Sequence, residues 1–195
     1  MFLVRRPDRD AIDRFLRESR DLPLSYDPPG IVRAESARRG IVEAKVAVGH
    51  GPRDFERARA ALLAWRQFDI GWIETFPKGA PVEAGSVVAV LIQHLGFWSL
   101  NGCRVVYCVG SREEGASFGF AYGTLTNHAE AGEELFEVFI DPRTEDVMYR
   151  IRATSWPRAT LALVGHPIVR ALQARFRHDS ATAMRLAIGR PLPIS

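Results

Sequence analysis

Long apolar runs are absent from this sequence of 195 residues. No uninterrupted apolar run exceeds six residues, as in 87–92, whereas a membrane-spanning helix needs about 20. The N-terminus also lacks the order of a signal peptide, because Arg5 and Arg6 follow a short apolar patch instead of preceding a longer one. We therefore expect no membrane insertion and a cytoplasmic protein.

Cysteine and lysine are both scarce. Cys103 and Cys108 are the two cysteines, and residues at an odd separation in one strand point to opposite faces. An intrastrand disulfide is therefore not expected, in agreement with a reducing cytoplasm. Only Lys45 and Lys78 of the 26 basic residues are lysines, which we interpret as genomic composition rather than as a signal for phosphate binding.

Recognised catalytic and cofactor motifs are absent as well. The sequence has no paired histidines at helical metal-binding spacing, no Cys-x-x-Cys, no Gly-x-Ser-x-Gly, no phosphate loop and no dinucleotide fingerprint. Its five histidines are scattered over different segments. We therefore expect no metal and no cofactor, and the catalytic residues, if there are any, remain unknown from the sequence.

What is present is an order of elements. A helix is expected from about residue 8, followed by an irregular segment rich in proline and glycine up to residue 40, a strand at 41–48 and a helix at 53–67. The period then changes to two, with short connections that favour an antiparallel meander. The expected strands are 70–76, 86–94, 98–109, 116–126, 133–140 and 147–155.

A long amphipathic helix at about 167–188 closes the sequence. The net charge of +3 is uneven, because residues 150–195 carry eight arginines and one acid. At 100° per residue, the apolar positions of this helix form one stripe, and four arginines (Arg170, Arg175, Arg177 and Arg185) lie on the other side. We expect these arginines to form a solvated face that pairs with Glu133, Glu134 and Glu137. The alternative is that they bind an anionic partner, such as nucleic acid or a membrane surface. We do not favour nucleic acid as a partner.

This order predicts an α+β fold of the helix-grip type, in which a curved antiparallel sheet of six or seven strands wraps the C-terminal helix and leaves a cavity. We expect an N-terminal helix and wrapping segment at 1–40, one domain at 41–190 and a tail at 191–195. The Gly119, Ala121 and Gly123 face of one strand permits close approach of the packed helix or of a ligand, and we favour the helix.

The run 87–92 is apolar on both faces of its strand, so both faces need cover. One face is expected to meet the C-terminal helix. The other is expected to meet either the segment 1–40 or a second subunit, which leaves a homodimer open.

Several ordered blocks carry a family resemblance. They are Leu-Pro-Leu-Ser-Tyr at 22–26, Phe-Glu-Arg-Ala at 55–58, Trp-Arg-Gln-Phe at 65–68, His-Leu-Gly at 94–96, Trp-Ser-Leu-Asn at 98–101, Cys-Arg-Val-Val-Tyr at 103–107, Gly-Phe-Ala-Tyr-Gly-Thr-Leu at 119–125, Gly-Glu-Glu at 132–134 and Arg-Phe at 175–176. They resemble the bacterial and plant family catalogued as domain of unknown function nineteen-ninety. The resemblance implies a distant relation to START-domain, birch-pollen-allergen and polyketide-cyclase-like proteins, which mostly bind apolar molecules in an internal cavity.

Polar and aromatic residues concentrate on the hairpin 94–107 and the strand after it. A small-molecule pocket combines apolar walls with a few convergent polar groups, so we expect a small apolar or amphipathic ligand. The alternatives are an enzyme of the cyclase, hydrolase or isomerase type on the same cavity, or structural roles for each residue, such as Asn101 at a turn and Arg104 paired with an acid. The candidate ligand-binding residues are His94, Trp98, Asn101, Arg104, Tyr107, Tyr122 and Thr124.

Overall fold

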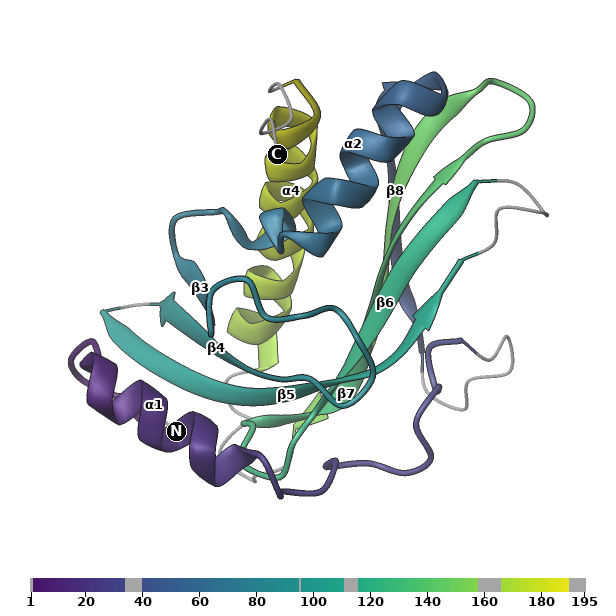
Figure 1. Ribbon diagram of the computed structural model, residues 1–195. Helices are drawn as coiled ribbons and strands as arrows, with labels where there is room; N and C mark the ends of the chain where they lie inside the picture. Colours follow the sequence, from purple (N-terminus) through teal and green to yellow (C-terminus); the bar gives the residue numbers. More distant parts are fainter. Residues whose placement is uncertain (1, 34–39, 95, 111–115, 158–165, 190–195) are drawn as a thin grey trace.

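One curved antiparallel sheet organises the chain (Figure 1). A computed structural model describes residues 2–33, 40–94, 96–110, 116–157 and 166–189, so the expected tail 191–195 lies outside the described residues. The strand order is β2-β8-β7-β6-β5-β4-β3, with β1 paired to β5. The strands are β1 (Phe2–Leu3), β2 (Val42–His50), β3 (Ile73–Phe76), β4 (Val87–His94), β5 (Phe97–Val109), β6 (Ser117–Thr124), β7 (Glu130–Ile140) and β8 (Asp146–Pro157).

The expected antiparallel meander is confirmed, and its closing step is the pairing of β2 with β8. Alternation of side chains along each strand gives the sheet two faces. We call the face that carries Phe120 and Tyr149 the concave face, and the opposite face, which carries Leu91 and Leu135, the convex face.

Two helices cover the concave face, as Figure 1 shows. They are α2 (Gly51–Leu63) and α4 (His166–Gly189), with the short helix η1 (Arg66–Phe68) between α2 and β3. Helix α2 ends earlier than the expected residue 67, because Trp65 takes a left-handed backbone with φ 58°. Aromatic rings from η1, β7 and α4 meet in the core on the concave face. The ring centroid of Phe68 lies 5.5 Å from that of Phe136 and 5.4 Å from that of Phe176.

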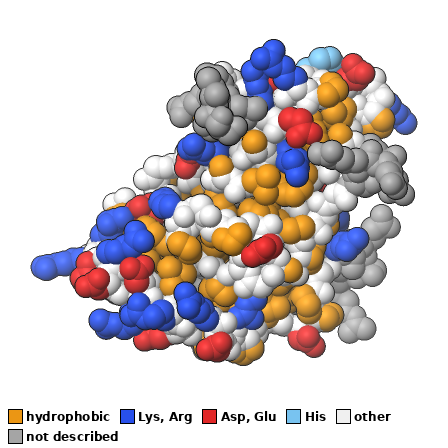
Figure 2. Space-filling view, viewed as in Figure 1, with side chains coloured by type: hydrophobic (Ala, Val, Ile, Leu, Met, Phe, Trp, Pro, Cys, Tyr) orange, Lys and Arg blue, Asp and Glu red, His pale blue; other side chains and the backbone are white. Residues whose placement is uncertain are grey.

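The N-terminal helix α1 (Arg9–Ser19) packs on the convex face. Asp8 caps it, because its carboxylate accepts a hydrogen bond from the Ala11 N–H at 2.8 Å. Ile12 and Phe15 are buried against Leu91 and its neighbours in β4 and β5. The segment 1–40 therefore supplies the second cover that the apolar run in β4 requires. Acidic and basic side chains lie interspersed over this helix in Figure 2.

The small-residue face of β6 has another neighbour than the one expected. A Cβ at Gly123 would overlap the hydroxyl group of Tyr26, and Val32 packs on Ala121. Both contacts come from the N-terminal segment on the convex face. The expectation that the C-terminal helix packs on this face is therefore wrong, because α4 lies on the opposite face with Phe136 and Phe176.

Candidate functional site

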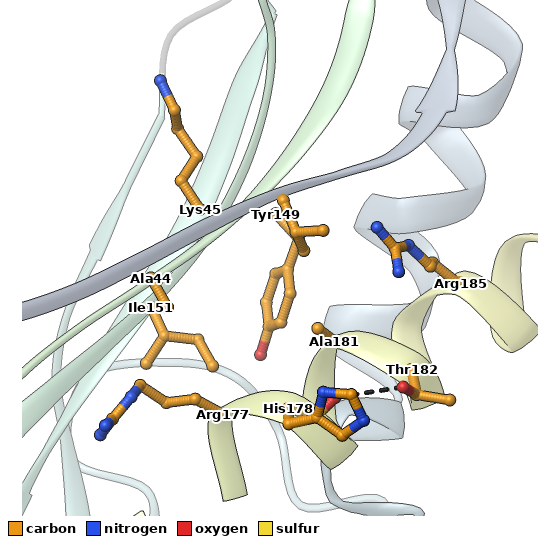
Figure 3. A pocket seen from close by; sticks show the side chains of 10 residues that line it. Ala44, Lys45, Tyr149, Ile151, Arg177, His178, Ala181, Thr182 and Arg185 are labelled. Carbon is orange, nitrogen blue, oxygen red and sulfur yellow. Dashed lines mark hydrogen bonds between the residues drawn. The ribbon is translucent and has the colours of Figure 1, made fainter. Parts of the chain in front are cut away.

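A pocket of about 220 Å³ lies between the edge of the sheet and α4 (Figure 3). Strands β2 and β8 form one wall and the middle of α4 forms the other. The pocket sits at this edge because β2 ends the order of the described strands there, with β8 as its neighbour. Its lining residues are Ala44, Lys45, Val46, Tyr149, Ile151, Arg177, His178, Ala181, Thr182 and Arg185.

Every ionisable side chain in the lining, apart from the tyrosine, is a base. Figure 3 shows the Lys45 side chain directed away from the pocket, and Arg185 Nε donates a hydrogen bond to the Ala47 carbonyl at 3.1 Å. Arg177 is half-buried, and its guanidinium group has no salt bridge within the described residues. Arg177 is therefore the arginine of the pocket that is most open to a new anionic partner, and His178 lies next to it in the lining.

Tyr149 joins the pocket to the core. Its ring lies between β2 and α4 in Figure 3, and its hydroxyl group lies 2.8 Å from the Ser180 hydroxyl group. Both residues are almost fully buried. Burial raises the pKa of the Tyr149 phenol well above its usual value, so this residue is a neutral hydrogen-bonding group at the inner end of the pocket.

Glu134 is half-buried on the concave face near this point. Tyr122 donates a hydrogen bond to Glu134 Oε2 at 2.8 Å. Desolvation raises the pKa of the Glu134 carboxyl from 4.5 to about 7, while the Tyr122 hydrogen bond and the charge of Arg177 act in the lowering direction. This carboxyl group therefore changes protonation in the neutral range.

The register of the sheet places Glu134 close to the pocket wall. Phe136 pairs with Ile151, which lines the pocket, and Glu134 pairs with Ala153. Residues two apart in a strand share a face and lie about 7 Å apart, so Glu134 is one side-chain row from Ile151. Arg177 lines the pocket and also acts electrostatically on Glu134. It therefore connects the pocket with this carboxyl group.

The predicted ligand residues are divided between the two faces of the sheet. Asn101 and Tyr122 lie on the concave face with Cys103 and Phe120, and alternation in β4 places His94 on the same face. Burial lowers the pKa of the His94 imidazole. Asn101 Nδ2 donates to Ser99 Oγ at 3.0 Å, while its Oδ1 has no hydrogen-bond partner within the described residues.

Two other candidates lie on the convex face, and Thr124 lies opposite Cys103 at the last residue of its strand. Trp98 packs with α1, and Arg104 donates to the carbonyls of Arg20 and Leu22 at 2.7 and 2.9 Å, just after α1 ends. Within the described residues, Arg104 therefore binds backbone oxygens and not an acid. Thr124, at the end of β6, bonds to Gly132 and to Ser25 of the N-terminal segment.

Tyr107 reaches the convex face through a β-bulge. Strict alternation would place it with Val105, on the concave face, but the register of β5 shifts between Val105 and Tyr107. A bulge inserts one extra residue and reverses the facing of the residues after it. The Tyr107 hydroxyl group consequently donates to Glu133 Oε1 at 2.9 Å.

The arginines of α4 do not form the uniform solvated face that the sequence suggests. Arg175 pairs with Asp179 of the same helix at 3.3 Å and stacks over the ring of Trp72 at 4.8 Å. The expected pairing with Glu133 and Glu137 is wrong, because Glu133 binds the N-terminal segment and Glu137 pairs with Arg150 of the neighbouring strand. Of the three glutamates expected to pair with these arginines, Glu134 is the one that interacts electrostatically with an arginine of α4 in the described residues, and that arginine is Arg177.

Sequence reasoning did not include Tyr149, Arg177 or Glu134 among the candidate ligand-binding residues, although it named Arg177 as a possible anion-binding arginine and Glu134 as its possible partner. Two signals were available in retrospect, because Tyr149 and Ile151 alternate in one strand and Arg177 directly follows the apolar Phe176. No group of three or more metal-binding side chains occurs among the described residues. In the same part of the chain, no helix is long and apolar enough to cross a membrane.

A curved antiparallel sheet that grips a long C-terminal helix, with a pocket between them, defines the START-like helix-grip class. Solved structures agree on the fold. TTHA0849 from Thermus thermophilus has a TM-score of 0.51 at 10% identity, covering 76% of this chain and 97% of that one. The Zhui aromatase/cyclase from Streptomyces sp. R1128 has a TM-score of 0.52 at 16% identity, covering 78% and 95%.

The chain belongs to the family described as "Domain of unknown function (DUF1990)", whose model matches residues 32–183. A relative called UPF0548 protein from Dictyostelium discoideum is 30% identical over 208 residues, covering 97% of this chain and 96% of the relative. Another UPF0548 protein, from Deinococcus radiodurans, is 32% identical and covers 96% of this chain and 99% of its own. The resemblance found in the sequence is thereby confirmed.

Proposed function

We propose that this protein binds a small amphipathic molecule in the pocket between the sheet edge and α4. The division of the pocket wall is the observation that supports the proposal. The strands contribute most of the apolar lining, including Ala44, Val46 and Ile151, whereas the helix contributes three of the four basic side chains, Arg177, His178 and Arg185. Small-molecule sites commonly combine apolar walls with a few polar groups that fix orientation. The strand side would hold the apolar part of the ligand and the helix side its polar part.

The size of the pocket limits the ligand. Its volume is about 220 Å³. This is below the usual range for drug-sized ligands, about 300 to 1,000 Å³. The pocket therefore suits a small molecule, or one end of a longer molecule that extends into solvent.

A second candidate function is an enzyme of the cyclase, hydrolase or isomerase type on the same site. Glu134 favours it, because a carboxyl group with a pKa of about 7 can give and take a proton near neutral pH. Tyr122 holds this carboxyl group by a hydrogen bond. This candidate predicts that the bound molecule is converted to a product and that Glu134→Gln stops the conversion while binding remains.

Native mass spectrometry of protein purified from its own host tests the binding proposal. We expect a copurified small molecule on the wild type, and its loss in Ala181→Trp, because the indole would fill the pocket that Ala181 lines. Ala174→Trp is the matched control, since Ala174 is exposed on the same helix and outside the lining. Retention of the molecule by Ala181→Trp, or its equal loss in both variants, would contradict the proposal.

A further inference from the structure

Arg177 belongs to two sites at once. It lines the pocket, where it is half-buried and has no salt bridge within the described residues. Its positive charge also acts on the half-buried carboxyl group of Glu134. An anion that binds Arg177 in the pocket therefore changes the electrostatic environment of Glu134 without touching it.

The other groups that face Glu134 do not replace this charge. They come from every strand around it and are Tyr122 of β6, Tyr149 of β8, Cys103 of β5 and Glu130 of β7. The phenols and the thiol are neutral, because burial raises the pKa of each above its usual value. Glu130 is an acid. Among the groups that act on Glu134, Arg177 is thus the one that carries a full positive charge and stabilises the ionised carboxylate.

Resting on the proposed function, we propose that the pocket takes the anion of a small amphipathic acid, that Arg177 binds its carboxylate, and that Glu134 takes up one proton as the anion binds. The proton comes from solvent and forms an O–H bond at Glu134. The added negative charge of the ligand and the added proton balance, so the site keeps its net charge. The hydrogen bond from Tyr122 remains available to the neutral carboxyl group.

The direction of the pH dependence follows from this exchange. Above pH 7 Glu134 is ionised and competes with the ligand for Arg177, so binding of the anion weakens as pH rises. The affinity is expected to fall by up to about tenfold per pH unit there, the limit for exchange of one proton. The ligand itself stays ionised at these pH values, because carboxyl groups of this kind have a pKa of about 4 to 5.

Isothermal titration calorimetry with octanoate tests the proposal, with octanol as the uncharged probe of the same chain length. The titration is run at pH 7.5 in two buffers that differ in ionisation enthalpy. Wild-type protein is expected to take up about 0.3 to 0.8 proton per octanoate. Octanol is expected to bind without proton exchange. This comparison needs no variant, so it stands even where a substitution impairs folding.

Two substitutions sharpen the test. Glu134→Gln is expected to remove proton uptake and the fall in octanoate affinity between pH 6 and 8.5, and Arg177→Gln to weaken octanoate at least tenfold while octanol still binds. Octanoate binding without proton uptake would overturn the role of Glu134 and leave the binding proposal standing. Failure of both probes to bind, or equal binding to Ala181→Trp, would instead overturn the proposed function.

Discussion

The two faces of the sheet treat two adjacent glutamates in different ways. On the convex face, the Glu133 carboxylate accepts hydrogen bonds from four groups: the hydroxyls of Tyr26 (2.6 Å) and Tyr107 (2.9 Å) and the backbone N–H groups of Gly30 (2.7 Å) and Val32 (3.3 Å). On the concave face, the Glu134 carboxylate accepts one, from Tyr122.

Although the main hydrophobic core lies on the concave face, the difference shows which face is closed by polar contacts and which face keeps a pocket. The convex face is closed by a segment whose donors match one carboxylate. The concave face keeps a pocket and an arginine, Arg177, that has no salt bridge within the described residues. Substitutions on both faces test this contrast, beginning with the largest expected effect on stability.

The largest effect is expected for Glu133→Ala. It leaves four donors without their acceptor, two of them hydroxyl groups, and each unpaired buried group costs about 1 to 3 kcal/mol. The free energy of unfolding should fall by at least about 4 kcal/mol in urea titrations. Glu137→Ala, on the same strand and face, is the control and should cost about 1 kcal/mol because its partner Arg150 is partly exposed. Equal costs would remove the special role of Glu133.

The next effect concerns pH and Glu134. Between pH 4.5 and 7, the native state binds more protons at this residue than the unfolded state, because its native pKa is about 7. The free energy of unfolding therefore falls as pH rises through this range, by roughly 3 kcal/mol at about 1.4 kcal/mol per pH unit. Glu134→Gln should lack this fall in urea titrations at pH 5, 6, 7 and 8. The same pH dependence in both proteins would show that Glu134 is not the titrating group.

A smaller effect is expected where the N-terminal segment crosses β6. Gly123→Ala places a methyl group on the Tyr26 hydroxyl and should lower the free energy of unfolding by about 2 kcal/mol, as overpacking does. The matched control is Gly40→Ala, where a Cβ meets nothing within 4 Å. Thermal or urea unfolding measures both variants. A harmless Gly123→Ala would mean that the segment packs less closely on β6 than the Tyr26 contact indicates.

The smallest effect on stability is expected at Arg177. Arg177→Gln removes a half-buried side chain without a salt bridge in the described residues, so the free energy of unfolding at pH 5 should change by about 0.5 kcal/mol or less. It should nevertheless raise the pKa of Glu134 further, because Arg177 lowers that pKa. The loss of stability with pH should then extend to higher pH. Arg170→Gln, an exposed arginine of the same helix, should leave the profile as in the wild type.

Much of the fold could be predicted from the sequence, because its signals are local. Alternation and short connections predict the antiparallel strands, and the apolar run in β4 predicts a second cover, which Ile12 and Phe15 provide. The family resemblance adds the helix-grip arrangement. The bulge that turns Tyr107 to the convex face was not predictable, because nothing in the local pattern marks the extra residue.

The site was harder to predict for a physical reason. Its walls come from Ala44, Ile151 and Ala181, which are brought together only when β2 pairs with β8 and α4 packs across both. Arg177 lies on the polar side of its helix by periodicity, yet the open sheet edge beside α4 leaves space there. Sequence periodicity shows which side of a helix is polar, but not where a neighbouring strand ends.

An NMR titration of ¹⁵N-labelled protein with octanoate tests the central claim most directly, because it locates binding on one of the two faces. The account predicts amide shift changes along β2 at Ala44–Val46 and along α4 at Arg177–Arg185, the segments that line the pocket. Amides of the N-terminal segment around Tyr26 and Val32 should not change. Shift changes centred on the convex face, or none at millimolar octanoate, would contradict the assignment of function to the concave face.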